Sequence, residues 1–102
     1  MPEVRLLGHA MRAALGAKKL NMPGEDVAAV LDEAVRRGGE PMARALFATP
    51  GQVSGARGEL NRDLRVLVNG RGMIWLDGVD TKLTEADSVT LLHSGARGWP
   101  GG

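Results

Sequence analysis

The chain has 102 residues, with 13 Lys and Arg residues against 12 Asp and Glu residues, and it contains no cysteine. This length fits one domain with a single core, which excludes a two-domain enzyme. The lack of cysteine excludes a disulfide scaffold, a thiolate zinc site and a cysteine nucleophile. The charges are evenly balanced along the chain, so it has no basic tail that could bind nucleic acid.

The apolar residues form no stretch long enough to span a membrane. The longest uninterrupted apolar run, residues 27–31, is far shorter than the roughly 20 residues that a spanning helix needs. The first residues include Glu3 and Arg5 and have no apolar stretch, so they do not resemble a signal peptide. We therefore expect a cytoplasmic protein that has no membrane partner.

Two short strands are predicted near the N-terminus. Residues 4–7 are mostly apolar and are followed by Gly8, which is typical of a buried or half-buried strand. Residues 11–15 have a helical composition but stop at Gly16, which leaves room for little more than a turn. Residues 18–22 predict a second strand, paired with the first as a hairpin.

The clearest periodicity predicts a helix over residues 25–37. Acidic residues begin it and basic residues end it, as the helix dipole favours, and Gly38-Gly39 follows as a stop signal. Residues 40–48, with Pro41 near their start, predict a shorter second helix, and residues 49–58 predict a loop. The apolar stripe of the first helix consists of Val27, Val30, Leu31, Ala34 and Val35.

A hairpin is predicted after the loop. Residues 63–68 alternate, so that Leu64, Val66 and Val68 share one face, and Asn69-Gly70 tolerates the positive φ angles of a tight turn. Residues 73–76 are apolar and predict the returning strand.

An irregular connection and a last strand complete the domain. Within residues 79–87 we expect Thr84 and Asp87 to cap turns, and residues 88–94 predict the last strand. Four of the final eight residues are glycine, which favours a flexible tail. The predicted organisation is thus a domain over residues 1–94 and a tail over residues 95–102.

The element order predicts an α+β domain in which one main helix covers one face of a mixed sheet. The opposite face is then bare, and strand alternation places Leu67 and Leu92 on it. We interpret these two leucines as an exposed, partner-binding apolar patch. An equally favoured alternative is that they are ordinary surface residues without a binding role, because scattered surface leucines are normal.

Several segments together resemble the MoaD/ThiS family of ubiquitin-like sulfur carrier proteins, and in particular its MoaD members. They are VLVNGR at residues 66–71, LDGVDTKL at residues 76–83, Asp-Ser-Val at residues 87–89, and the final Gly101-Gly102. The resemblance covers the whole chain but is specific over its last third. It implies a ubiquitin-like β-grasp fold and a non-enzymatic carrier, whose C-terminal glycine is adenylated by a partner activating enzyme with ATP and converted to a thiocarboxylate.

A terminal Gly-Gly permits this chemistry without any catalytic side chain. At neutral pH the carboxylate of Gly102 is ionised and can attack the α-phosphorus of ATP, after which a persulfide sulfur replaces AMP. Glycine at position 101 suits a tail that threads a narrow channel in the activating enzyme. The tail departs from the usual family pattern, because it is longer and places Trp99-Pro100 directly before the glycines. We expect Gly98, Trp99, Pro100 and Gly101 to be the threading residues.

The resemblance implies two protein partners, the activating enzyme and the large subunit of molybdopterin synthase as sulfur acceptor. The same terminal chemistry also serves thiamine, cysteine or tRNA thiolation, or a ubiquitin-like modifier that is joined to lysines. A third alternative is a β-grasp interaction module with an inert tail. We expect no bound cofactor, no metal at His9 or His93, and no nucleic-acid partner.

Overall fold

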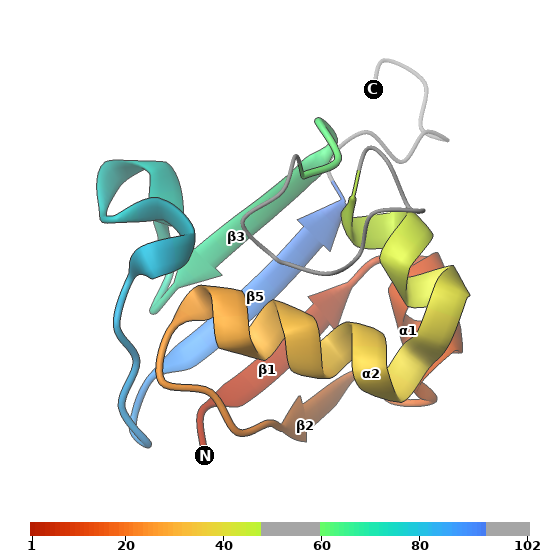
Figure 1. Ribbon diagram of the computed structural model, residues 1–102, viewed down its shortest axis with the longest axis horizontal. Coiled ribbons are helices and arrows are strands. Elements are labelled where there is room, and N and C mark those ends of the chain that lie inside the picture. The colour runs from red at the N-terminus through yellow and green to blue at the C-terminus, as the bar shows by residue number, and fades with distance from the viewer. Residues whose placement is uncertain (48–59, 94–102) are drawn as a thin grey trace.

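Residues 1–47 and 60–93 are described by the computed structural model, and they form a five-stranded sheet with helices on one side (Figure 1). The elements follow one another as β1 (Glu3–Leu7), α1 (His9–Leu15), β2 (Lys19–Asn21), α2 (Val27–Leu46), β3 (Leu64–Val68), β4 (Arg71–Gly72), the 3-10 helices η2 (Met73–Trp75) and η3 (Gly78–Asp80), and β5 (Ser88–His93).

The sheet is mixed, with the strand order β2-β1-β5-β3-β4. The two central strands, β1 and β5, are parallel, while the β1–β2, β3–β5 and β3–β4 pairs are antiparallel. α2 crosses one face of this sheet (Figure 1). The expected α+β fold, a mixed sheet with one main helix packed on one face, is therefore confirmed.

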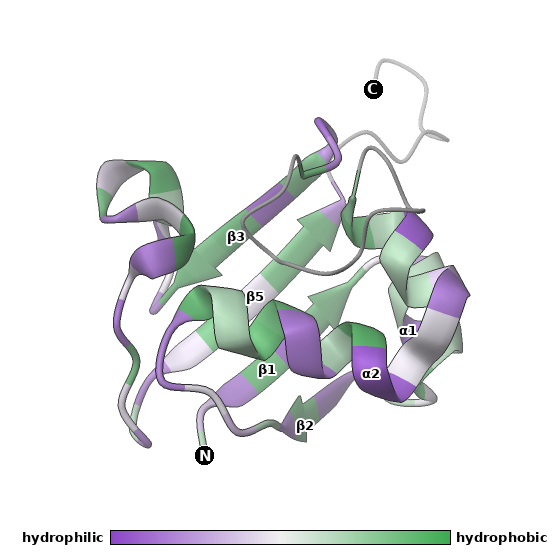
Figure 2. Ribbon diagram, in the orientation of Figure 1, coloured by the Kyte–Doolittle hydropathy of each residue, from purple (hydrophilic) through white to green (hydrophobic). Residues whose placement is uncertain are grey.

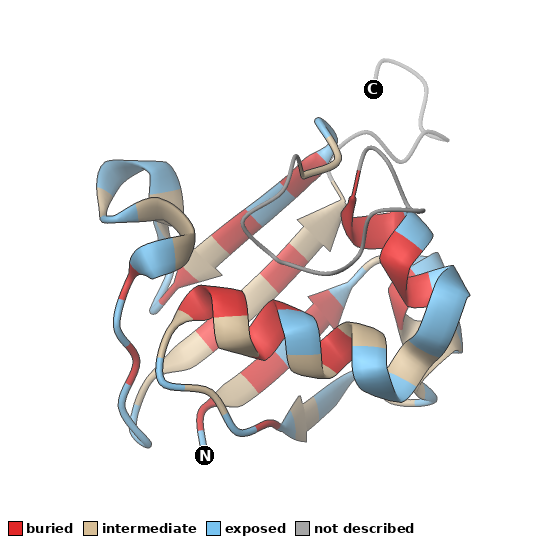
Figure 3. Ribbon diagram, in the orientation of Figure 1, coloured by how far each residue is buried: buried red, intermediate tan, exposed pale blue. Residues whose placement is uncertain are grey.

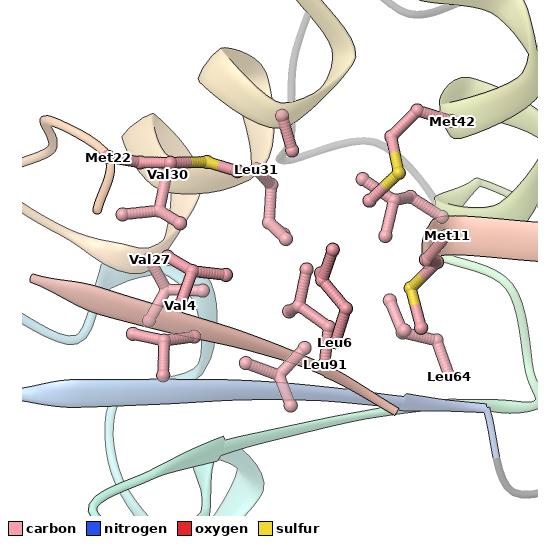
Figure 4. Packing of buried hydrophobic residues seen from close by; sticks show 14 of the residues in the cluster. Val4, Leu6, Met11, Met22, Val27, Val30, Leu31, Met42, Leu64 and Leu91 are labelled. Carbon is pink, nitrogen blue, oxygen red and sulfur yellow. The ribbon is translucent and has the colours of Figure 1, made fainter. Parts of the chain in front are cut away.

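The hydrophobic core lies between α2 and the sheet. In Figure 4, side chains from the helix point toward side chains from the strands, and the burial colours of Figure 3 alternate along β3 and β5. Figure 2 shows that α2 alternates between hydrophobic and hydrophilic segments, as an amphipathic helix does. Fully buried members from both layers are Val4, Leu6, Val27, Val30, Leu31, Ala34, Val89 and Leu91.

The predicted register of β3 is confirmed. Its residues Leu64, Val66 and Val68 are buried with the helix stripe, whereas Leu67 is half-buried on the other face. Within the predicted stripe, Val35 alone is half-buried, and it packs against the rim of the core.

α2 begins at Val27, two residues later than predicted, because Asp26 is extended and caps the helix. The Ala29 amide donates to Asp26 Oδ1 at 2.8 Å. The Val27 amide donates to the carbonyl of Thr81 at 3.1 Å, which ties the start of the helix to the segment before β5.

Gly39 divides α2 into two parts. Its φ of 70° and ψ of −153° are non-helical and belong to a region that glycine alone visits readily. Pro41 follows two residues later, where proline is tolerated because the helix restarts there. The predicted second helix corresponds to the part of α2 that ends at Leu46. Residues 48–59, including the predicted loop, lie outside the described residues.

The prediction of only a turn at residues 11–15 is wrong, because these residues belong to α1. The helix buries Met11 and ends at Gly16, whose φ is 71° and whose amide donates to the Arg12 carbonyl at 2.7 Å. It also lies close to α2, since a Cβ added at Gly38 would meet Leu15 Cδ2 at 3.1 Å. Tertiary packing therefore stabilises a two-turn helix that its sequence alone does not.

The predicted tight turn at Asn69-Gly70 is confirmed, with φ values of 54° and 84°, but the predicted strand over residues 73–76 is wrong. β4 is limited to Arg71–Gly72, and the Leu76 amide then donates to the Met73 carbonyl at 2.9 Å within η2. A short run of consecutive apolar residues does not distinguish a buried strand from other structures. Here the run is not buried, because Ile74 and Trp75 are 76% and 78% exposed.

Candidate functional site: the outer sheet face and the end of β5

The C-terminal tail follows β5, which lies in the middle of the sheet. β5 pairs with β1 on one side and with β3 on the other, and its last residue, His93, is opposite Leu64. The predicted activation and threading residues, Gly98, Trp99, Pro100, Gly101 and Gly102, all lie outside the described residues. Their proposed roles therefore stay predictions.

His93 fixes the point at which the tail leaves the sheet. Its Nε2 lies 2.6 Å from the carbonyl oxygen of Ala45, near the end of α2. In this contact Nε2 carries a hydrogen and donates it to the carbonyl, since a carbonyl oxygen only accepts. A Cβ added at Gly8 would lie 3.4 Å from His93 Cβ, so β1, α2 and β5 meet closely there. The tail starts from an anchored residue.

The predicted patch residues Leu67 and Leu92 lie on the outer sheet face, opposite α2. Both are half-buried. Leu92 is paired with Leu7 of β1 and with Arg65 of β3, while Leu67 is paired with Thr90 and Gly72. The two leucines are thus diagonal to each other rather than directly opposite.

Sequence reasoning missed three apolar residues of this region, Leu7, Ile74 and Trp75. Leu7 is 44% exposed and is paired with Leu92, which extends the apolar surface toward β1. Trp75 lies beside Leu67, because a Cβ added at Gly72 would be 3.4 Å from Trp75 Cδ1 and 3.9 Å from Leu67 Cδ2. The assignment of residues 73–76 to a strand concealed the exposure of two of these side chains.

The charges of the outer face differ along the sheet. Near β2, Glu3 forms ion pairs with Arg5 at 3.1 Å and Lys19 at 3.4 Å. The hydrogen bond from Arg5 is the main cause that lowers the pKa of Glu3. Near β3, Arg65 donates to the backbone carbonyls of Arg62 and Leu64. Near β2, the basic residues are thus paired with a carboxylate. Near β3, the guanidinium of Arg65 is bonded to backbone carbonyl oxygens instead.

Asn69 and Asp87 hold the β3–β4 turn against the start of β5. Asn69 Nδ2 donates to Asp87 Oδ1 at 2.9 Å, and the Ser88 amide donates to Asn69 Oδ1 at 2.9 Å. The Thr84 amide donates to Asp87 Oδ2 at 2.8 Å, so the predicted capping by Asp87 is confirmed. These hydrogen bonds, with that from Asn69 the largest, lower the pKa of Asp87. Hydrogen bonds thus connect the VLVNGR segment at residues 66–71 to the Asp-Ser-Val segment at residues 87–89.

Within residues 1–47 and 60–93, no cluster of three potential metal ligands occurs, and neither His9 nor His93 belongs to one. No helix in this part of the chain has the length and apolar character needed to cross a bilayer.

Comparison with solved structures identifies similar proteins along nearly the whole chain. The solution structure of small archaeal modifier protein 1 from Methanosarcina acetivorans has a TM-score of 0.75 and 25% identity, covering 94% of each chain. CysO from Mycobacterium tuberculosis has a TM-score of 0.73 and 22% identity, covering 92% of this chain and 99% of that one. The Amycolatopsis orientalis BexX/CysO complex gives a TM-score of 0.74 and 21% identity, covering 96% and 100%.

No protein-family model matches the sequence, and no curated protein matches it significantly. The assignment of the fold family therefore rests on the similarity to solved structures. It supports the broad part of the resemblance and not the molybdopterin synthase subunit in particular. The chain has the β-grasp fold of ubiquitin-like proteins.

Proposed function

We propose that this protein is a sulfur carrier whose reactive group is the carboxylate of Gly102. The observation that carries the proposal is the combination of a ubiquitin-like β-grasp fold with a Gly-Gly sequence that ends nine residues beyond His93, the last residue of the central strand. Nine extended residues span up to about 30 Å, enough to reach into the active site of a partner enzyme. The described domain then provides the surface that this enzyme binds.

The proposed reaction requires three steps whose reagents other proteins supply. The Gly102 carboxylate attacks the α-phosphorus of ATP and forms an acyl-adenylate with release of pyrophosphate. The terminal sulfur of a protein persulfide then displaces AMP, and a thiol reduces the resulting acyl disulfide to release the thiocarboxylate. ATP is consumed by the activating enzyme, and this chain supplies no catalytic side chain.

The outer face is the proposed docking surface for the activating enzyme. Leu67 and Leu92 are half-buried in the free protein, and Leu7 adds to the same surface. Covering these side chains would stabilise a complex through apolar burial. Complex formation by a protein of this shape has a precedent, since CysO of Amycolatopsis orientalis was solved in a complex with BexX.

We further propose that the acceptor of the sulfur is a molybdopterin synthase large subunit, as the MoaD resemblance implies. The name of the Methanosarcina protein, a small archaeal modifier protein, favours a second candidate function, in which the activated Gly102 is joined to lysines of other proteins. Both functions share the adenylation step and differ in the nucleophile that follows it.

Pyrophosphate exchange tests the shared step. The full-length protein, incubated with its activating enzyme, ATP and labelled pyrophosphate, should return label to ATP. A variant that lacks Gly102 and a variant with one alanine appended should not, although both should melt at the temperature of the parent protein. A shared melting temperature excludes unfolding as the cause. Equal exchange by all three proteins would overturn the proposal.

A further inference from the structure

Strand β3 has a free edge on the side away from β5. β4 pairs there with Leu67 and Val68 only, so within the described residues no strand pairs with Leu64, Arg65 or Val66 on this side. Val68 is paired with Arg71 on this edge. Because hydrogen bonding alternates along an antiparallel strand, the backbone N–H and C=O of Val66 face outward at the same edge.

A groove of about 470 Å³ follows this free edge. One wall is β3 from Leu64 to Leu67, and the other runs from Gly72 to Trp75 through η2. Figures 2 and 3 show the region around η2, at the upper left, with hydrophobic segments that are exposed. The groove thus combines the outward backbone groups of Val66 with an apolar wall, which are the two features that an added strand uses. At the same edge the Leu64 amide donates to the Asn61 carbonyl at 3.0 Å, and the Leu64 carbonyl accepts from the Arg65 guanidinium at 3.2 Å.

The charges beside the groove select its occupant. Residues 60–72 contain three arginines, Arg62, Arg65 and Arg71, against one acidic residue, Asp63. Arg65 lines the groove and is exposed, and its guanidinium donates to backbone carbonyls. The groove is therefore complementary to negative charge.

We propose that the β3 edge binds an extended segment of a partner protein, in which apolar residues are flanked by acidic residues. The segment pairs its backbone with the outward N–H and C=O of Val66, places an apolar side chain against Leu67 and Trp75, and pairs its carboxylates with the arginines. A second copy of this chain fits less well, because edge-to-edge pairing would bring the arginines of both copies together. The C-terminal tail carries Arg97 and no acidic side chain, so it also fits less well.

A fluorescent peptide provides the test. The probe is an eight-residue peptide with four central valine and isoleucine residues flanked on each side by Asp-Glu, and its control has lysines in place of the acids. We expect the full-length protein to bind the acidic peptide at least about tenfold more tightly than the lysine peptide. Arg65→Glu should remove most of this preference, whereas Arg44→Glu, the same charge change on α2, should retain it.

Hydrogen exchange provides a readout specific to the strand edge. Saturating acidic peptide should slow exchange of the Val66 amide and leave that of the Lys19 amide, in β2 at the opposite end of the sheet, unchanged. Equal affinity for both peptides, or unchanged exchange at Val66, would overturn the proposal. Concentration-dependent dimerisation that protects Val66 without peptide would replace the peptide by a second copy. All of these measurements use the purified protein alone, so they are independent of its activation at Gly102.

Discussion

The two faces of the sheet use the same strands for different purposes. Facing α2, alternate residues such as Val66 and Leu91 are buried in a continuous core. On the outer face, their neighbours Leu67 and Leu92 are half-buried and share the surface with Arg65. Burial against α2 therefore holds the domain together, while the outer face leaves apolar and charged side chains partly exposed.

The largest expected effect comes from placing a charge in the core. Leu31→Asp leaves a carboxylate without a partner among fully buried side chains and should lower the free energy of unfolding by about 3–5 kcal/mol. This is a large part of the stability of a small domain. Urea denaturation measures the loss. The exposed neighbour provides the control, since Asp32→Asn should change stability by no more than about 0.5 kcal/mol. Similar midpoints for the two variants would refute the packing described for α2.

A smaller loss is expected at the break in α2. Gly39→Ala forces a Cβ onto a backbone with a φ of 70° and should cost about 1–3 kcal/mol, although the methyl group would meet Pro41 Cδ only at an ordinary contact distance of 3.9 Å. Thermal unfolding measures the effect. If the helix ran straight through this position, Gly39→Ala would instead raise the midpoint, because alanine favours a helix over glycine by about 1 kcal/mol.

Adjacent residues of β3 allow the two faces to be compared directly. Val66→Asp also places a charge in the core and should cost about as much as Leu31→Asp, because Val66 is 3% exposed, whereas Leu67→Asp should cost no more than about 1 kcal/mol. Leu67→Asp should instead weaken binding to the activating enzyme, which titration calorimetry measures. Equal destabilisation by both substitutions would mean that the outer face is as tightly packed as the core.

The smallest expected effect is a pH dependence at the β3–β4 turn. Because hydrogen bonds lower the pKa of Asp87 below its ordinary value of 3.8, the ionised group stabilises the fold above that pH. The stabilisation is lost as the pH falls through the lowered pKa. Asp87→Asn should therefore reduce the urea midpoint at pH 7 and differ progressively less from the parent protein below about pH 4. A difference that stays constant over this pH range would contradict the role given to Asp87.

Strong local patterns were sufficient to predict much of the fold. The stripe from Val27 to Ala34 and the alternation around Val66 identified the two layers of the core, and Asn69-Gly70 identified the tight turn. α1 could not be predicted as a helix because its stability depends on packing Met11 into the core and Leu15 against α2. Such tertiary contacts leave little trace in seven residues.

The candidate site was less predictable than the fold. Alternation placed Leu67 and Leu92 on the outer face, but an apolar run at residues 73–76 suggested burial where Ile74 and Trp75 are exposed. Apolar composition does not reveal which side of the chain faces water. The free edge of β3 follows from the shortness of β4, which depends on where the chain turns after Gly72.

The central claim is that Gly102 carries the chemistry and that the described domain presents it. The most direct test is the intact mass of the protein isolated from its native cells. The account predicts a chain that ends at Gly102, with a fraction heavier by the mass difference between one sulfur and one oxygen atom. That fraction should disappear when Gly102 is deleted from the gene. A chain whose mass shows no such fraction in cells that contain the activating enzyme, or one that keeps it after Gly102 is deleted, would contradict the claim.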